Sequence, residues 1–137
     1  MSATTALRIG VVGYGFGRFH VQTLIHLAGV DLVAVADAVR YDELCSDARR
    51  YDFEPYRDAN AMIAKERLDA LCVCVPPAHR AAIVTAALEA DVALFIEKPW
   101  ASDPTRAREL AAACAQARRP VMAGFSFRFH PAIAKLR

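Results

Sequence analysis

Short apolar segments alternate with segments of helical character, and this alternation restricts the fold more than any other feature of the sequence. The apolar segments are residues 7–12, 32–36, 53–56, 71–75, 92–96 and 121–127. Continuous apolar runs of this length are typical of strands buried on both faces. Strands that alternate with helices form crossover units and a parallel sheet. We therefore expect an α/β fold with a doubly wound parallel sheet of about six strands in the order 3-2-1-4-5-6.

The segments between the apolar runs predict helices. Within residues 17–28, apolar side chains recur at the spacing of one helix face, at Val21, Leu24, Ile25 and Ala28. Further helices are expected over 41–51, 59–66 and 78–89, from residue 104, and from residue 131. Asp58 and Asp103 precede two of these segments and are expected to cap them.

Composition and charge exclude several classes of protein. The 137 residues correspond to about one domain, and 55% of them are hydrophobic, which is enough for one sizeable core. The net charge of +2 arises from 17 basic and 15 acidic residues, so we expect no nucleic-acid partner. No apolar run approaches the ~18 residues of a membrane span, and no basic leader opens the chain, so we expect no membrane partner either.

The cysteines predict neither a metal site nor a disulfide framework. They lie at positions 45, 72, 74 and 114, without the paired spacing of a zinc site. Cys72 and Cys74 are two residues apart in a strand-like run, so we expect both to lie in the core on one face of the sheet. This use of cysteine is typical of a reducing cytoplasm.

A glycine-rich turn follows the first apolar run and indicates a dinucleotide-binding Rossmann fold. Residues 13–18 read Gly-Tyr-Gly-Phe-Gly-Arg and lead into the first helix. Glycines allow the tight turn and close approach to a pyrophosphate, which the helix N-terminus attracts. Asp37 ends the second strand, 22 residues after Gly15, where a carboxylate can bind ribose hydroxyls. A tight strand-to-helix turn without a ligand is the alternative.

Two details qualify this motif. Asp37 would repel a 2′-phosphate, so we expect NAD, although Arg40 nearby makes NADP possible. In the pattern G-x-G-x-x-G counted from Gly13, the third glycine position holds Arg18. Because that glycine serves close packing between helix and strand, we expect less ideal packing there.

Three segments carry a more specific resemblance. They are Glu97-Lys98-Pro99 after the apolar run 92–96, the turn Val75-Pro76-Pro77, and residues 124–132, which read Gly-Phe-Ser-Phe-Arg-Phe-His-Pro-Ala. In order and spacing the chain resembles the N-terminal half of the Gfo/Idh/MocA oxidoreductases, the family of glucose-fructose oxidoreductase and inositol dehydrogenase. The resemblance extends from Arg8 to Arg137.

The resemblance implies a nicotinamide-dependent enzyme that acts on a hydroxyl or carbonyl of a sugar, cyclitol or derivative. It places Lys98 near the nicotinamide and the reacting oxygen, with Glu97 orienting it, and assigns no metal. An ammonium there can stabilise developing alkoxide charge. Arg128 matches a position near the substrate pocket. The cofactor-binding residues it implies are Gly13, Gly15, Phe16, Gly17, Asp37, Val75, Pro76, Glu97 and Lys98. A surface salt bridge at a strand end is the alternative for Lys98.

The chain departs from the family pattern at several positions. Arg80 stands where members often carry a histidine, and His79 lies one residue earlier, so we expect no ligand role for His79. A common glycine before the fifth strand is replaced by Ala90-Asp91. Trp100 stands where leucine is frequent and is expected to pack. His20 and His26 are expected to cap or cover the first helix rather than act as bases.

The family pattern also predicts more protein than this chain contains. Residues 1–130 are expected to form the Rossmann domain, and residues 131–137 to begin the connection to a second α/β domain. That absent domain would supply an acid/base Asp and His, most of the substrate pocket and the contacts of a homo-oligomer, so the chain alone is expected to be inactive. A non-catalytic dinucleotide-sensing module is the alternative, and a different Rossmann reductase is a third possibility. Retention of Glu97 and Lys98 argues against the sensor.

Overall fold

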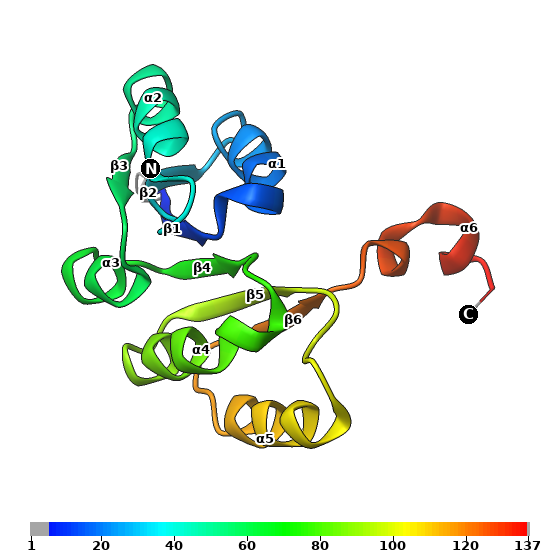
Figure 1. The fold of residues 1–137 in the computed structure, drawn as a ribbon. Coiled ribbons are helices and arrows are strands. Elements are labelled where there is room, and N and C mark those ends of the chain that lie inside the picture. The colour runs from blue at the N-terminus through cyan, green and yellow to red at the C-terminus, as the bar shows by residue number, and fades with distance from the viewer. Residues whose placement is uncertain (1–5, 137) are drawn as a thin grey trace, which may run out of the picture.

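The computed structural model describes residues 6–136, which contain one parallel sheet of six strands (Figure 1). The strands are β1 (Leu7–Val12), β2 (Val30–Ala36), β3 (Glu54–Tyr56), β4 (Ala70–Val73), β5 (Ala93–Glu97) and β6 (Val121–Gly124). Their order is β3-β2-β1-β4-β5-β6, and every neighbouring pair is parallel. The predicted doubly wound fold is confirmed.

Helices cover both faces of the sheet. In Figure 1, α1 (Tyr14–Leu24) and α2 (Tyr41–Tyr51) lie on one face, and α3 (Ala59–Lys65), α4 (Arg80–Glu89) and α5 (Pro104–Ala115) lie on the other. The short helix α6 (Pro131–Ala134) lies beyond the sheet, at the red end of the chain. Asp58 and Asp103 cap α3 and α5 as predicted, since each carboxylate accepts a backbone N–H from the first turn.

Each face of the sheet has its own apolar core. Leu71 and Val73 of β4 pack with α3 and α4, whereas Cys72 and Cys74 face the layer of α1 and α2. The predicted position of these two cysteines on one sheet face is therefore confirmed. All four cysteines are free, and burial raises the pKa of the Cys72 thiol to about 12. Residues 6–136 contain neither a cluster of metal-ligating side chains nor a helix that meets the length and apolarity of a bilayer span.

Gly17 brings α1 close to the sheet. A Cβ atom at this position would lie 2.9 Å from Val11 Cγ1 and 3.3 Å from Cys74 Cβ. Gly17 therefore provides the close helix–strand packing that the third glycine of the pattern usually provides. The expectation that Arg18 weakens this packing is wrong, because the side chain of Arg18 turns to the Gly15 carbonyl and to Glu43.

Several element boundaries differ from those expected. Helix α1 begins at Tyr14 rather than 17, because Gly13 has φ 93° and its carbonyl already accepts the Gly17 N–H. Strand β6 ends at Gly124 rather than 127, since residues 126–129 form a 3₁₀ turn. At the end of α4, Asp91 adopts the left-handed conformation, φ 57°, where the family pattern has glycine.

Replacing Gly17 by alanine is expected to destabilise the fold. The new methyl group must displace Val11 or Cys74, and overpacking of this kind costs about 1–3 kcal/mol. Better helix propensity offsets about 1 kcal/mol, so the free energy of unfolding should fall by about 1 kcal/mol in urea titrations. Gly15→Ala is the control, because its Cβ would meet nothing closer than Arg40 Nε at 3.6 Å. Equal stability of the two variants would contradict the packing argument.

Candidate cofactor site

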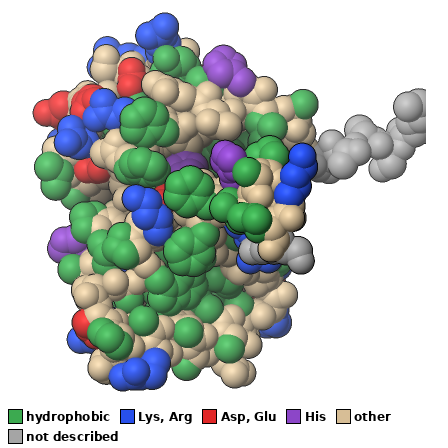
Figure 2. All heavy atoms as spheres, turned by 90° about the vertical axis from the view of Figure 1, so that its right-hand side faces the viewer, with side chains coloured by type: hydrophobic (Ala, Val, Ile, Leu, Met, Phe, Trp, Pro, Cys, Tyr) green, Lys and Arg blue, Asp and Glu red, His purple; other side chains and the backbone are tan. Residues whose placement is uncertain are grey.

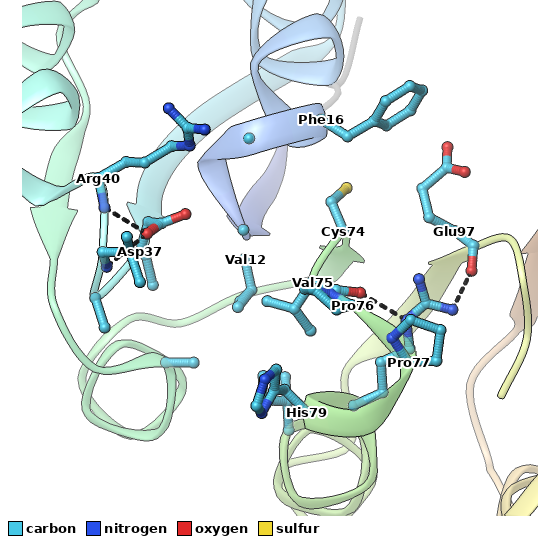
Figure 3. A pocket seen from close by; sticks show the side chains of 18 of the residues that line it. Val12, Phe16, Asp37, Arg40, Cys74, Val75, Pro76, Pro77, His79 and Glu97 are labelled. Carbon is cyan, nitrogen blue, oxygen red and sulfur yellow. Dashed lines mark hydrogen bonds between the residues drawn. The ribbon is translucent and has the colours of Figure 1, made fainter. Parts of the chain in front are cut away.

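A cavity of about 800 Å³ opens at the carboxyl ends of the central strands. It lies between the ends of β1 and β4, where the strand order reverses. The strands β1 and β2 lie on one side of this point, and β4 and β5 lie on the other. Open α/β sheets bind ligands at this point. Figure 3 shows the cavity between Asp37 and Arg40 on one side and Glu97 on the other, with Phe16 above and His79 below.

The glycine-rich turn forms one wall of the cavity. Gly13 has φ 93°, and a Cβ atom there would lie 2.7 Å from the backbone nitrogen of Val75, so only glycine fits. A Cβ atom on Gly15 would meet only the Arg40 side chain, with Nε at 3.6 Å, and the first turn of α1 has backbone N–H groups that have no partner within the helix. These features fit a bound phosphate group, which needs donors and close access to the backbone.

Asp37 connects the turns that follow β1 and β2. Its Oδ2 accepts the Tyr14 N–H at 2.6 Å. Its Oδ1 accepts the N–H groups of Val39 and Arg40 at 2.8 Å each (Figure 3). A carboxylate has about four acceptor sites, so about one is left for a ribose hydroxyl. The sequence predicted the ribose contact but not this structural role of the carboxylate.

Glu97 and Lys98 form the opposite end of the cavity. The Glu97 carboxylate accepts hydrogen bonds from His20 Nε2 at 2.9 Å and from the backbone N–H of Lys98 at 3.1 Å. The Lys98 Nζ lies 5.9 Å from the centre of the Phe16 ring. No ion pair of Lys98 occurs within the described part of the chain. The ammonium group is therefore available to a ligand.

Arg80 joins the ends of β4 and β5. Its side chain is buried, and its guanidinium donates to the carbonyls of Val75, Glu97 and Pro99. Burial lowers the pKa of Arg80, while the nearby Cys74 and Glu97 oppose this shift. Arg80 thus fixes the backbone on both sides of Lys98. Sequence reasoning treated Arg80 only as a departure from a family pattern.

The model of an oxidoreductase family with an NAD-binding Rossmann fold matches residues 7–125. This chain belongs to the Gfo/Idh/MocA oxidoreductase family. The family resemblance seen in Glu97-Lys98-Pro99, in Val75-Pro76-Pro77 and in the segment from Gly124 is confirmed.

Several proteins are similar to this member of the family. D-apiose dehydrogenase from Paraburkholderia graminis is 35% identical over 140 residues, covering 97% of this chain and 37% of the relative. Inositol 2-dehydrogenase 1 from Saccharopolyspora erythraea is 34% identical over 135 residues, covering 96% and 40%. The crystal structure of myo-inositol dehydrogenase from Lactobacillus casei in complex with NAD(H) and myo-inositol has a TM-score of 0.86 at 26% identity, covering 96% and 40%. The chain thus spans about two fifths of the length of these relatives.

The structure brings most residues expected from the family pattern to the cavity. Its lining includes Gly13, Gly15, Phe16, Asp37, Val75, Pro76, Glu97 and Lys98. Gly17 lies beneath the turn and packs against the sheet instead. His79, for which no ligand role was expected, also lines the cavity, whereas Trp100 packs partly buried against the core as expected.

Arg128 and His20 lie at the edges of the site. Arg128 is exposed in the 3₁₀ turn of residues 126–129 and does not line this cavity, and its place near a substrate pocket stays a prediction. His20 was expected to cap or cover α1, but it contacts Glu97 at the cavity. Histidine seven positions into a helix carries no sequence signal for such a contact, because its partner lies 77 residues away.

Large hydrophobic side chains are exposed on the same side of the molecule as α6. Figure 2 views this side and shows hydrophobic side chains spread across it. Phe125, Phe127 and Phe129 follow β6 and are more than half exposed. The apolar run 121–127 predicted a longer strand, but the chain leaves the sheet after Gly124.

Removal of the Arg80 guanidinium is expected to destabilise the protein strongly. Arg80→Met leaves the carbonyls of Val75, Glu97 and Pro99 without their donor, and unpaired buried acceptors cost about 1–3 kcal/mol each. We expect a loss of about 3 kcal/mol in the free energy of unfolding, measured by urea denaturation. The exposed Arg108 on α5 provides the control, since Arg108→Met should change stability by less than about 0.5 kcal/mol. Similar losses in both variants would contradict the proposed role of Arg80.

Proposed function

We propose that this chain is the cofactor-binding part of an NAD(P)-dependent dehydrogenase that transfers hydride between nicotinamide and a hydroxyl- or carbonyl-bearing carbon of a sugar, cyclitol or derivative. The observation that supports this most directly is a single cavity with a glycine turn and Asp37 at one end and an unpaired lysine, Lys98, at the other. The names of the relatives, which include inositol and D-apiose dehydrogenases, support the substrate class.

The cavity residues suggest how a dinucleotide would be held. The turn at Gly13 and Gly15, with the N-terminus of α1, would bind the pyrophosphate, and Asp37 would bind the adenosine ribose. Val75 and Pro76 form the wall after β4, and Phe16 and Glu97 border the far end. When bound, the nicotinamide supplies the acceptor or donor of the hydride.

Lys98 is the proposed catalytic residue of this chain. Its ammonium can donate a hydrogen bond to the substrate oxygen and stabilise negative charge that develops there. Glu97 would orient it through the backbone, because the carboxylate accepts the Lys98 N–H. Arg80 would support the same segment through the carbonyls of Glu97 and Pro99.

The adenosine end of the cavity favours NAD over NADP. The charge of Asp37 would repel a 2′-phosphate. Arg40 and Arg57 also line this end, but Arg40 is paired with Glu43 at 3.3 Å and Arg57 with Asp42 at 3.6 Å. Both arginines can turn toward a phosphate only by giving up these contacts, so we propose NAD as the cofactor, with weaker binding of NADP.

Titrations with NADH and NADPH, followed by nicotinamide fluorescence, test the cofactor assignment. We expect NADH to bind about tenfold more tightly, a difference of about 1.4 kcal/mol. Arg40→Ala should weaken NADPH further and leave NADH nearly unchanged. Gly15→Ala should weaken both, because the methyl group occupies the space of the phosphate. Tighter binding of NADPH by the unmodified protein would overturn the role assigned to Asp37.

We propose residues 1–130 as the dinucleotide-binding domain and residues 131–137 as the start of a connection to a substrate-binding and oligomerisation domain. The support is that the relatives are about two and a half times as long as the part they share with this chain. The acid/base residues and most substrate contacts would come from that domain, and the family resemblance suggests a homo-oligomer. The four free cysteines support a cytoplasmic location.

Turnover by the full-length protein tests the catalytic role of Lys98. A panel of polyols that includes myo-inositol is incubated with NAD, and formation of NADH is followed by absorbance. Lys98→Ala should lower turnover about 10²- to 10³-fold, as expected for loss of a donor to a developing oxyanion, with little change in NADH affinity. Unchanged turnover would refute the role of Lys98. Cofactor binding without turnover of any polyol or sugar would instead support a dinucleotide-sensing module.

A further inference from the structure

We propose that His20 is a positioning residue that keeps Glu97 from forming an ion pair with Lys98, and so leaves the lysine ammonium free to act on the substrate. This inference rests on the proposed function of Lys98. It concerns a contact between the first helix and the end of β5, which the sequence alone did not indicate.

Glu97 is held in a defined position by its surroundings. Its side chain is 10% exposed, and a Cβ atom on Gly124 of the neighbouring strand β6 would lie only 3.2 Å from Glu97 Cδ. Gly124 thus leaves the space that the carboxylate fills. One carboxylate oxygen accepts the Lys98 backbone N–H at 3.1 Å, and the other faces His20 at 2.9 Å.

The orientation of His20 follows from the chemistry of its partner. An ionised carboxylate only accepts hydrogen bonds, so His20 Nε2 carries the proton and donates it to Glu97 Oε1. The imidazole ring is also packed edge-on between aromatic side chains, with ring centres 5.2 Å from Phe95 and 5.9 Å from Phe16. These contacts restrict the ring to one orientation, in which it covers the carboxylate.

Lys98, the next residue in the chain, carries a second cation that this carboxylate could bind. Its Nζ lies 5.9 Å from the centre of the Phe16 ring, and the same ring lies against His20. The ammonium and the imidazole therefore share Phe16 as a neighbour. Lysine has a long side chain with several rotatable bonds, and a carboxylate that loses one hydrogen-bond donor attracts the closest cation.

Other charged groups near Glu97 do not take the place of His20. The guanidinium of Arg80 on α4 donates to backbone carbonyls. Burial keeps the thiols of Cys72, on β4, and Cys74, just after β4, neutral by raising the pKa of each. Among residues 6–136, His20 is thus the side chain that satisfies the Glu97 carboxylate, and loss of its donor leaves Lys98 as the remaining mobile cation at this end of the cavity.

The rate of Lys98 acylation by acetic anhydride tests the proposal without cofactor or substrate. The reagent reacts with the neutral amine, so an ion pair with Glu97 slows the reaction. The chain contains three lysines, and Lys65 and Lys135 serve as internal references when peptides are quantified by mass spectrometry. We expect His20→Leu to lower the relative rate at Lys98 about threefold, the effect of a partly exposed ion pair.

The double variant His20→Leu/Glu97→Gln distinguishes an ion pair between Lys98 and Glu97 from a general structural effect of the His20 substitution. The neutral amide cannot hold the ammonium as an ion pair, so the relative rate at Lys98 should return toward that of the unmodified protein. The exposed His26, on the turn after α1, gives the control, and His26→Leu should leave the rate unchanged. An unchanged rate in His20→Leu, or a lowered rate that Glu97→Gln does not restore, would overturn the proposal.

A second pair of variants keeps the test valid if His20→Leu does not fold. In His20→Gln the amide can still donate from the ε position, whereas in His20→Asn it is too short to reach Glu97. We expect the relative acylation rate at Lys98 to fall in His20→Asn but not in His20→Gln. Equal rates in these two variants would overturn the proposal. NADH binding by each variant is measured separately, so failure of the cofactor assignment is distinguished from failure of the role of His20.

Discussion

The contact between Gly13 and the backbone of Cys74 and Val75 determines how closely the ends of β1 and β4 approach each other. A Cβ atom on Gly13 would lie 2.7 Å from Val75 N and 2.8 Å from the Cys74 carbonyl carbon, so the two segments touch through backbone atoms alone. This approach brings the start of α1 beside the turn that precedes α4. Asp37 then connects the glycine-rich turn after β1 to the residues after β2, because its carboxylate accepts three backbone N–H groups. The geometry of the cavity depends on these contacts more than on any side chain that lines it.

Two buried charged groups, Arg80 and Glu97, lie together at the end of the cavity that is farther from Asp37. Their charges are satisfied in different ways. Arg80 donates to carbonyl oxygens of two chain segments, so its charge is spread over neutral acceptors. Glu97 accepts one side-chain and one backbone donor. Buried polar groups of this kind are costly unless every donor and acceptor is satisfied. The segment that carries Lys98 is therefore held by interactions that tolerate little change.

Local patterns predicted the fold and the glycine-rich end of the site, because their physical basis is local. Buried parallel strands require apolar runs, and a tight turn against another backbone requires glycine, so Gly13 and the strand order could be inferred from neighbouring residues. The contacts of His20 and Arg80 with the end of β5 could not, because those partners lie 77 and 17–19 residues away in the sequence. The end of β6 was predicted too late, because the apolar residues 125–127 leave the sheet and enter a 3₁₀ turn.

The cavity is assembled from segments that span residues 12–99, and this has a consequence for folding. Its walls come from the ends of five strands, β1 to β5, whose pairings join residues far apart in the chain. A partly folded chain with only the first helix and its flanking strands lacks the wall that contains Val75 and Glu97. A dinucleotide therefore binds the native state almost exclusively, and it stabilises the fold by an amount that rises with the ratio of its concentration to its dissociation constant. At a ligand concentration 100 times the dissociation constant, this contribution is about 2.7 kcal/mol. Cellular cofactor concentration would thus control how long the folded protein survives proteolysis.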